Sequence, residues 1–536
     1  MATSSILCSF ILLILFSSFS LQTSASFSRQ TSGDSAQRFV QCLTRYAKNS
    51  ESITQVVFTP ANASYNPILQ LNLQNLRFNT SGTRKPLAIV TPVEDTQIQA
   101  VIYCARKNSM NVRTRGGGHD FEGVSYTAEV PFVLLDMINY NRVNIDLKTS
   151  TAWVQSGISL GEFYYKISQT SDVLAFPAGL VSTVGLTGLL GGGGYGMMKR
   201  KYALAADNTL DARIVDYNGK ILDRKSMGED LFWAIRGGDP ASFCVILELK
   251  LQLVPVPKLV TYFAVQRTLE QNGSALFQKW QSTAVNVFPR DLDVRVVVDT
   301  ITSNSSARED KKTVRFIFQS LYLGKIDTLL PIMKEYFPEL GLVREDCVET
   351  SWIKTAPMFS FFPVGTDPKI LLNKTAPTRN PVKIKSSFTT QPISLEGLNG
   401  IWDLWLKQPV QTTLIQYTPF GGKMNEFAES ALPFPHRPGV LYMINIAVTL
   451  NQNAEATLQW INDLFKYYTP YVTKNPRTSY VNYRDADLGT GSKTYQEASI
   501  WGRKYYKNNF DRLVKIKSVV DPQNFFNHKQ SIPLLM

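Results

Sequence analysis

Two glycine-rich segments, at 113–126 and 175–196, constrain this chain more than any other feature. The first begins with Arg113 and Arg115 and runs directly into three consecutive glycines. Consecutive glycines leave their backbone N–H groups open to an anion, because no Cβ stands in the way. Flexible linkers are also rich in glycine, but these segments adjoin apolar, strand-like stretches, which linkers lack. We therefore expect two loops that hold a long cofactor with a pyrophosphate.

The first 25 residues are typical of a cleaved secretory signal. Residues 6–21 are largely apolar, and a small-residue cleavage motif ends at Ala25. A membrane anchor is the alternative, but the apolar stretch is short for a span, and we expect no stable membrane insertion. N-glycosylation motifs favour the secretory pathway. They lie at Asn62, Asn79, Asn272, Asn304 and Asn373.

Cysteine usage and charge narrow the class further. Cys8 leaves with the signal, and four cysteines remain, of which one pair is compatible with an oxidising compartment. There is no CxxC motif and no His and Cys cluster at zinc spacing, so we expect no metal. The formal net charge of +13 comes from scattered Lys and Arg, and no nucleic-acid motif accompanies it. We interpret it as a solvated surface and expect no nucleic-acid partner.

The chain of 536 residues is too long for one core, so two or three lobes are expected. A first α+β part has periodicities that predict helices at 35–49 and 94–107, and strands at 87–90, 111–114, 131–136, 152–154, 212–215 and 245–253. The prolines of 254–257 indicate a boundary. Beyond it the pattern predicts strands at 293–298, 314–322 and 441–448, and helices at 326–336 and 454–468.

The two glycine-rich segments, in this order, resemble the berberine bridge enzyme family of plant flavoproteins, which has the vanillyl-alcohol oxidase fold. The resemblance runs from about residue 39 to 533 through blocks in family order. These blocks are 86–92, 201–208, 228–238, 433–437, 482–485 and 521–526.

The resemblance implies a two-domain α+β flavoprotein. Its FAD domain would combine residues 26–255, with a core at 82–255, and a returning segment at 476–536. Residues 256–475 would form a substrate domain, a sheet backed by helices. It also implies a disulfide between Cys42 and Cys104, with Cys244 and Cys347 free and buried.

The family pattern also implies which residues hold FAD. His119 matches the histidine bonded to the flavin, and Val181 stands where the family usually has a cysteine, so we expect a single covalent link. Val184 stands at the oxygen-gate position, where valine accompanies oxidases. The expected cofactor-binding residues are His119, Arg115, Gly116, Gly117, Gly118, Ser125, Gly179, Thr183, Val184, Gly185, Gly188, Gly194, Tyr195, Val245, Asn482 and Tyr483.

The expected catalytic residues are Tyr483, Tyr195 and Asn445. Tyr483 matches a tyrosine proposed as base in relatives. A phenol has a reference pKa of about 10, so it needs a cation or the flavin to act near neutral pH. Asn445 and Met443 are the inward positions of the 441–446 strand that carries a base in relatives. With Phe121 in place of a tyrosine, the pocket is expected to be apolar. His436 is expected to structure a loop, and His528 is given no role.

The leading hypothesis is a secreted plant oxidase, extracellular, in the cell wall or in the vacuole. It would act on a prenylated phenol or an alkaloid, with hydride passing to flavin N5 and O2 becoming H2O2. A second hypothesis is a Diels–Alderase of the same fold without net redox, because a cycloaddition needs orientation rather than a base. A third is a flavin- or carbohydrate-binding defence protein without turnover. The oligomeric state stays open.

Overall fold

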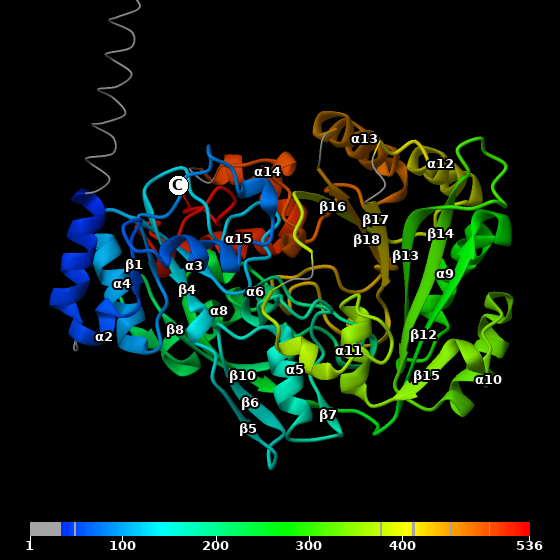
Figure 1. The fold of residues 1–536 in the computed structure, drawn as a ribbon, viewed down its shortest axis with the longest axis horizontal. Coiled ribbons are helices and arrows are strands. Elements are labelled where there is room, and N and C mark those ends of the chain that lie inside the picture. The colour runs from blue at the N-terminus through cyan, green and yellow to red at the C-terminus, as the bar shows by residue number, and fades with distance from the viewer. Residues whose placement is uncertain are drawn as a thin grey trace, which may run out of the picture.

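The structure, a computed structural model, describes residues 34–47, 50–375, 378–409, 413–450, 453–491 and 494–535. The expected signal peptide, residues 1–25, lies outside the described residues. Figure 1 shows small sheets and helices from the N-terminal half on one side and a large sheet with its helices on the other. The expected α+β class is confirmed.

The first sheet has four short strands in the order β1 (Val57–Phe58), β2 (Ala88–Val90), β4 (Phe132–Asp136) and β3 (Asn111–Arg115). Strands β2, β4 and β3 are parallel. Helix α4 (Asp95–Lys107) connects β2 to β3, and a capping box between Glu94 and Gln97 begins it. This strand, helix and strand lie at the positions that the periodicity predicted.

The second sheet is antiparallel, in the order β5 (Val143–Asp146), β6 (Thr151–Gln155), β10 (Val245–Gln252), β8 (Thr209–Val215) and β9 (Ile221–Leu222). A separate short pair joins β7 (Leu174–Ala175) to β11 (Val254–Pro255). Helices in this half include α2 (Ser50–Thr54), α3 (Tyr65–Leu71), α5 (Leu160–Ser168), α6 (Leu186–Gly191), α7 (Lys199–Tyr202) and α8 (Arg224–Ala234).

The large sheet has seven antiparallel strands. Their order is β15 (Cys347–Thr350), β12 (Val260–Thr268), β14 (Lys312–Tyr322), β13 (Leu292–Thr302), β17 (Thr413–Pro419), β18 (Tyr442–Thr449) and β16 (Val382–Thr389). Its helices are α9 (Gly273–Asn286), α10 (Ile326–Tyr336), α11 (Trp352–Phe359), α12 (Leu395–Trp405) and α13 (Ala454–Tyr467). The three strands and two helices expected here are present, with β13 longer than predicted.

The two faces of the large sheet differ in character because successive side chains of a strand point to opposite faces. On one face, Val296, Ile415 and Ile446 belong to a core that also contains Trp280, Trp402 and Ile461 from the covering helices. The other face therefore carries the alternate positions of the same strands, and it is this face that lines the site.

The C-terminal segment returns to the first half of the molecule. Helices α14 (Tyr495–Tyr506) and α15 (Asn509–Val520), orange and red in Figure 1, lie beside the N-terminal half. Trp501 and Phe510 share one buried cluster with Phe232 of α8. Lys383 of β16 bonds Asp485 at 2.6 Å and so ties this segment to the large sheet. The domain boundaries expected at 255 and 475 stay a prediction.

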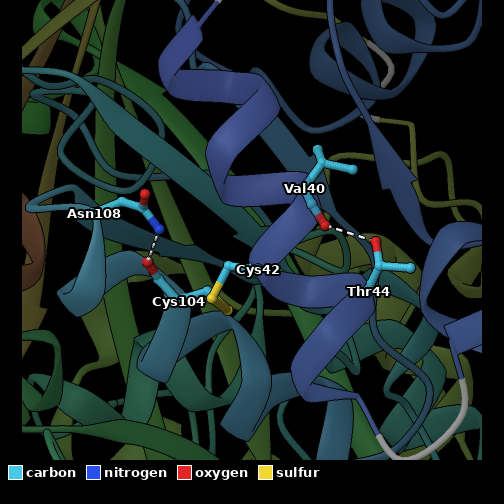
Figure 2. The surroundings of a disulfide bond; sticks show 5 residues. All are labelled: Val40, Cys42, Thr44, Cys104 and Asn108. Atoms are coloured by element: carbon cyan, nitrogen blue, oxygen red, sulfur yellow. Dashed lines mark hydrogen bonds between the residues drawn. A yellow bond between two sulfur atoms is a disulfide. The ribbon is translucent and has the colours of Figure 1, made fainter.

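The expected disulfide is confirmed. Cys42, in the helix at 34–46, is bonded to Cys104 of α4 across a separation of 62 residues (Figure 2). Cys244 is free and buried, as expected. Cys347 is free but only half-buried, so the expectation that it is buried is wrong. It begins β15, the edge strand of the large sheet, and an edge strand leaves one side uncovered.

Candidate active site

A cavity of about 400 Å³ lies where the glycine-rich loops face the large sheet. The loops supply residues at 112–125 and 179–195, the C-terminal segment supplies 480–484, and α11 and the turn after it supply Phe359 and Phe361. Side chains from four strands of the large sheet also line the cavity, all from the face opposite the helix-covered core. These are Arg295, Ile384, Leu414, Gln416, Asn445 and Ala447.

The glycines allow the two loops to pack backbone against backbone. A Cβ on Gly117 would lie 2.4 Å from the nitrogen of Gly185 and 2.5 Å from the carbonyl oxygen of Thr183. Gly118 has φ +68°, a conformation that side-chain-bearing residues rarely adopt, and a Cβ there would overlap the carbonyl oxygen of Asn72. The glycines thus hold both loops at the wall of the cavity.

The residues around the cavity fit an FAD. Gly188 of α6 lines it, and a Cβ built there meets nothing within 4 Å, so this wall faces open space. Ser125 Oγ and Arg484 Nη1 also belong to lining residues, and both are buried without a hydrogen-bond partner in the described chain. Buried polar atoms are rarely left unpaired. A dinucleotide carries phosphate and hydroxyl oxygens, which can serve as the missing hydrogen-bond partners of Ser125 Oγ and Arg484 Nη1.

His119 stands on the loop wall of the cavity. Its Nε2 lies 2.9 Å from Thr183 Oγ1 in the second glycine-rich segment. Burial lowers the pKa of His119 to about 4, and a hydrogen bond with the Thr183 backbone opposes that shift only in part. The imidazole is therefore neutral at ordinary pH, and Nδ1 keeps a lone pair or a proton for a partner in the cavity.

Tyrosines from distant segments meet at the cavity. The hydroxyls of Tyr195 and Tyr483 are hydrogen-bonded to each other. The Tyr483 ring packs at a steep angle against Tyr480, with centroids 5.2 Å apart, and against Phe121, with centroids 5.8 Å apart. Tyr480 accepts hydrogen bonds from the Gly194 backbone nitrogen and from Asn482. The cluster fixes the Tyr483 hydroxyl at the cavity.

Opposing effects act on the acidity of Tyr483. Burial raises the pKa of Tyr483, and the hydrogen bond with Tyr195, the charge of Arg295 and the Asn445 side chain act in the opposite direction. The balance leaves its pKa above the usual value. The pKa of Tyr195 lies well above it, first because of burial and then because of Tyr483. Both phenols are therefore neutral at neutral pH in the protein without bound ligands.

The large sheet presents two amide side chains, Asn445 and Gln416, and one positively charged side chain, Arg295, to the cavity. Asn445 of β18 is directly opposite Gln416 of β17, and its Nδ2 lies 3.5 Å from Gln416 Oε1. Asn445 Oδ1 is buried with no hydrogen-bond partner among the described residues. Arg295 of β13 donates from Nε and Nη2 to Gln319 Oε1, at 2.8 and 2.5 Å.

A charged cluster closes the cavity beside the C-terminal segment. Arg484 lies 3.1 Å from Asp120 and 3.2 Å from Asp239, and His528 lies 2.8 Å from Asp239. Burial alone would raise the pKa of Asp239, but Arg484 and His528 hold it well below its usual value. The cluster is therefore an ion-paired wall that keeps Arg484 positioned at the cavity.

The structure brings most expected site residues to this cavity. Those that line it are Gly116, Gly117, Gly118, His119, Ser125, Gly179, Val181, Val184, Gly185, Gly188, Tyr195, Asn445, Asn482 and Tyr483. Thr183 does not line the cavity itself, but its Oγ1 contacts Nε2 of His119. Phe121 also lines the cavity, whereas Met443 packs beside it in a cluster with Phe388 and Phe434.

Several expectations need correction. The Arg115 side chain does not line the cavity, because it bonds Asp136, its register partner on β4, at 2.6 Å. Val245 belongs to the core under the first sheet and is 1 % exposed. Gly194 forms a turn with φ +73° rather than a wall of the cavity. His528, given no role, lines the cavity.

The third histidine, His436, was expected to structure a loop. His436 stacks on Phe388, with ring centroids 3.7 Å apart, and bonds the Ser479 carbonyl oxygen at 3.1 Å. It therefore holds a loop in place, as expected.

Sequence reasoning missed Arg295, Gln416 and the α11 aromatics Phe359 and Phe361. Arg295 had a signal: it is a charged residue inside an apolar strand pattern, and such residues are rarely buried without a reason. Phe361 is 63 % exposed at the rim and has φ +68°. Nothing in its local sequence indicates that conformation.

The described residues contain no cluster of three or more His, Cys, Asp or Glu placed to hold a metal ion. Among the described helices, none combines the length and apolar character needed to cross a bilayer. The asparagines of the glycosylation motifs, at 62, 79, 272, 304 and 373, are all exposed.

Comparisons with known proteins place this geometry in a family. Residues 86–224 match the model of the FAD binding domain, and residues 479–533 match the model named berberine and berberine like. Tetrahydroberberine oxidase of Berberis wilsoniae is 44 % identical over 97 % of this chain and 98 % of its own. Monolignol oxidoreductase AtBBE-like 13 of Arabidopsis thaliana is 43 % identical over 93 % of both chains.

A solved structure agrees. The structure of BBE-like #28 from Arabidopsis thaliana is 42 % identical and superimposes with a TM-score of 0.86, over 93 % of this chain and 100 % of that one. The vanillyl-alcohol oxidase fold is thereby confirmed. The chain belongs to the berberine bridge enzyme-like family of FAD-dependent oxidoreductases.

Proposed function

We propose that this protein is a secreted plant oxidase that uses FAD to oxidise a specialised metabolite, a prenylated phenol or an alkaloid. The observation that carries the proposal is one cavity lined both by a neutral imidazole and by the hydrogen-bonded pair of Tyr195 and Tyr483. When bound, FAD supplies the acceptor for the substrate's hydride, and O2 then takes both electrons as H2O2. The aromatic walls give a planar substrate a fixed orientation.

His119 is the proposed covalent anchor. A histidine nitrogen attacks only when it is unprotonated, and burial keeps the pKa of His119 at about 4. Thr183 occupies Nε2, which leaves Nδ1 for the bond. Val181 lines the same cavity, and its side chain has no thiol for a second link. We therefore propose one covalent bond between the protein and the cofactor, through His119.

Tyr483 is the proposed group that accepts a proton from a substrate hydroxyl, with Tyr195 as its hydrogen-bond partner and Asn445 orienting the substrate. Burial opposes ionisation of Tyr483, while Tyr195, Arg295 and Asn445 favour it. A base whose pKa is raised above 10 is present in its active form only in a small fraction at pH 7. The rate should therefore increase with pH through the neutral range.

Val184 is the proposed route for O2. Its side chain lines the cavity on the second glycine-rich segment. Its small size leaves space beside the loop that a bulkier aliphatic side chain would fill.

Secretion is proposed from the N-terminal signal, and the asparagines of all five glycosylation motifs lie on the surface. The extracellular space, the cell wall or the vacuole is the proposed location. The disulfide between Cys42 and Cys104 is compatible with this route, because disulfides persist in oxidising compartments.

The test is anaerobic mixing of the yellow protein with fractionated plant extract, followed by air. We expect one fraction to bleach the flavin, air to restore it with release of peroxide, and mass analysis to show a product two hydrogens lighter. Tyr483→Phe should bind the same fraction and bleach about 100-fold or more slowly, the usual range for loss of a general base. A new cycloadduct formed without bleaching or peroxide would replace this proposal with the redox-neutral one.

A further inference from the structure

Arg295 is a buried cation with no carboxylate partner. Its residue is 1 % exposed, yet it lines the cavity from the middle of β13. No carboxylate oxygen of the described residues lies within 4 Å of its guanidinium. Nε and Nη2 share a single acceptor, Gln319 Oε1, and Nη1 makes no hydrogen bond to the described part of the chain.

Other buried cations in the described chain either lie against a carboxylate or donate to several carbonyl oxygens. Carboxylates face Arg115, Lys199, Lys383, Arg437, Arg484 and Lys517 at 2.5–3.2 Å. Two arginines lack a carboxylate within 4 Å but have several carbonyl acceptors. Arg113 donates to the carbonyl oxygens of Val112, Thr127 and Asn527, and Arg200 donates to those of Val285, Phe288, Leu292 and Phe420. Arg295 therefore differs from them, because a single amide oxygen accepts its hydrogen bonds. Its guanidinium also lies 5.8 Å from the centre of the Phe359 ring, which carries no negative charge, and the residue lines the cavity.

The surroundings do not supply the missing anion. The ionisable groups closest in electrostatic effect to Arg295 are Tyr195, Tyr483 and Tyr262, followed by Asp293. Burial raises the pKa of all three tyrosines, so their hydroxyls are neutral at pH 7. Asp293 is engaged by Lys199 at 2.6 Å. An isolated buried charge is strongly unfavourable, and a ligand anion removes that penalty.

We propose that Arg295 binds an anionic oxygen of the substrate, a carboxylate or an acidic phenolate carried on an aromatic ring. The inference rests on the proposed function, since it concerns the same cavity. The ring would lie among Phe121, Phe359 and Tyr483, which line the same cavity as Arg295, with Phe359 in contact with the guanidinium. Because two cations repel in a desolvated site, the same arrangement disfavours a protonated alkaloid amine. Of the two substrate classes, the structure thus favours the acidic phenolic one.

Three probes that share a phenol ring test this on the flavin-containing protein under anaerobic conditions. They are 4-hydroxybenzoate, its methyl ester and tyramine, which carry a negative, neutral and positive group. Binding is measured by calorimetry and by the change in flavin absorbance, so no turnover is needed. We expect the acid to bind at least tenfold more tightly than the ester, and tyramine to bind most weakly, because hydrogen bonds between charged groups are the strong ones.

Matched variants assign the preference to one side chain. Arg295→Gln should make the acid and the ester bind equally, whereas Arg295→Lys should keep part of the preference. Arg315→Gln is the control, because it removes one positive charge from the same sheet, where Arg315 pairs with Asp299. It should leave the preference unchanged. 4-Nitrophenol, whose ionised form is coloured, distinguishes a site for a phenolate from a site for a carboxylate. If Arg295 binds a phenolate, the apparent pKa of 4-nitrophenol should fall when it binds the wild-type protein. It should not fall when it binds the Arg295→Gln variant.

The inference is overturned if tyramine binds best, or if Arg295→Gln retains the wild-type ratio of acid to ester. It is also overturned if Arg295→Gln leaves all three affinities unchanged and only shifts the pH profile of turnover upward, since Arg295 would then serve Tyr483 alone. Should Arg295→Gln fail to fold, the ranking of the three probes on the wild-type protein still decides. Failure of the oxidase proposal looks different, because probes would bind while no substrate bleaches the flavin.

Discussion

Adding one methyl group at each of two glycines should have opposite effects on this protein. Gly188, in α6, lines the cavity, and a Cβ there meets nothing within 4 Å. Replacing glycine by alanine inside a helix stabilises a protein by up to about 1 kcal/mol, so Gly188→Ala should raise the stability of the flavin-free protein. At Gly117 the Cβ would lie 2.4 Å from the Gly185 nitrogen. Overpacking of this kind costs about 1–3 kcal/mol.

The effect on the cofactor should be the reverse of the effect on the fold at Gly188. If FAD fills the space beside α6, the added methyl must overlap it, with a penalty in the same range of about 1–3 kcal/mol. At 1.4 kcal/mol per factor of ten, affinity for FAD should fall by about fivefold to about 100-fold. Gly117→Ala should weaken FAD binding as well, but only together with a loss of folding stability.

The assay uses a His119→Ala background, in which flavin is not covalently held and can be removed and added back. Urea unfolding, followed by tryptophan fluorescence, gives the stability of the flavin-free protein, and quenching of flavin fluorescence gives the affinity. The reasoning is refuted if Gly188→Ala binds FAD as tightly as its parent, or if it destabilises the flavin-free protein.

Two further predictions concern stability. Replacing Cys42 and Cys104 by serine should lower the free energy of unfolding by about 2–5 kcal/mol, because the crosslink closes a long loop; the same urea midpoint would show it, and an unchanged midpoint would contradict it. His436 is neutral in the fold, because burial, and then Lys507, lowers its pKa well below 6.5. The unfolded chain binds a proton there as pH falls through about 6.5 and the folded chain does not, so stability should decrease toward acid. His436→Gln should flatten that slope between pH 7 and pH 5, and parallel slopes would argue against it.

Local patterns predicted the elements of the fold well. Helix α4 and strand β3 follow from residues that stand next to one another in the sequence, and the glycine-rich segments form walls of the cavity as expected. Asn445 lines the cavity together with Ala447, because alternate residues of β18 share a face, and the family resemblance had implied this position. Features set by neighbouring residues were therefore within reach of the sequence.

Features that depend on pairing between distant segments could not be predicted from the sequence. Arg113 and Arg115 look equivalent in the sequence, but only Arg115 is opposite Asp136 in the register of β3 and β4. Asp136 holds the Arg115 guanidinium, whereas Arg113 lines the cavity. The free edge of Arg295 depends on which residue of β14 lies beside it, and Gln319 takes two of its donors. Such choices follow from strand register across tens of residues.

We propose that FAD is held in this cavity through His119 alone. The direct measurement is acid denaturation of the purified protein, proteolysis, and mass spectrometry of the yellow peptides. We expect that the colour stays with the protein, that every flavin-bearing peptide contains His119, and that His119→Ala releases its flavin into the acid supernatant. Free flavin in the supernatant of the wild-type protein, or flavin on any cysteine, would contradict it.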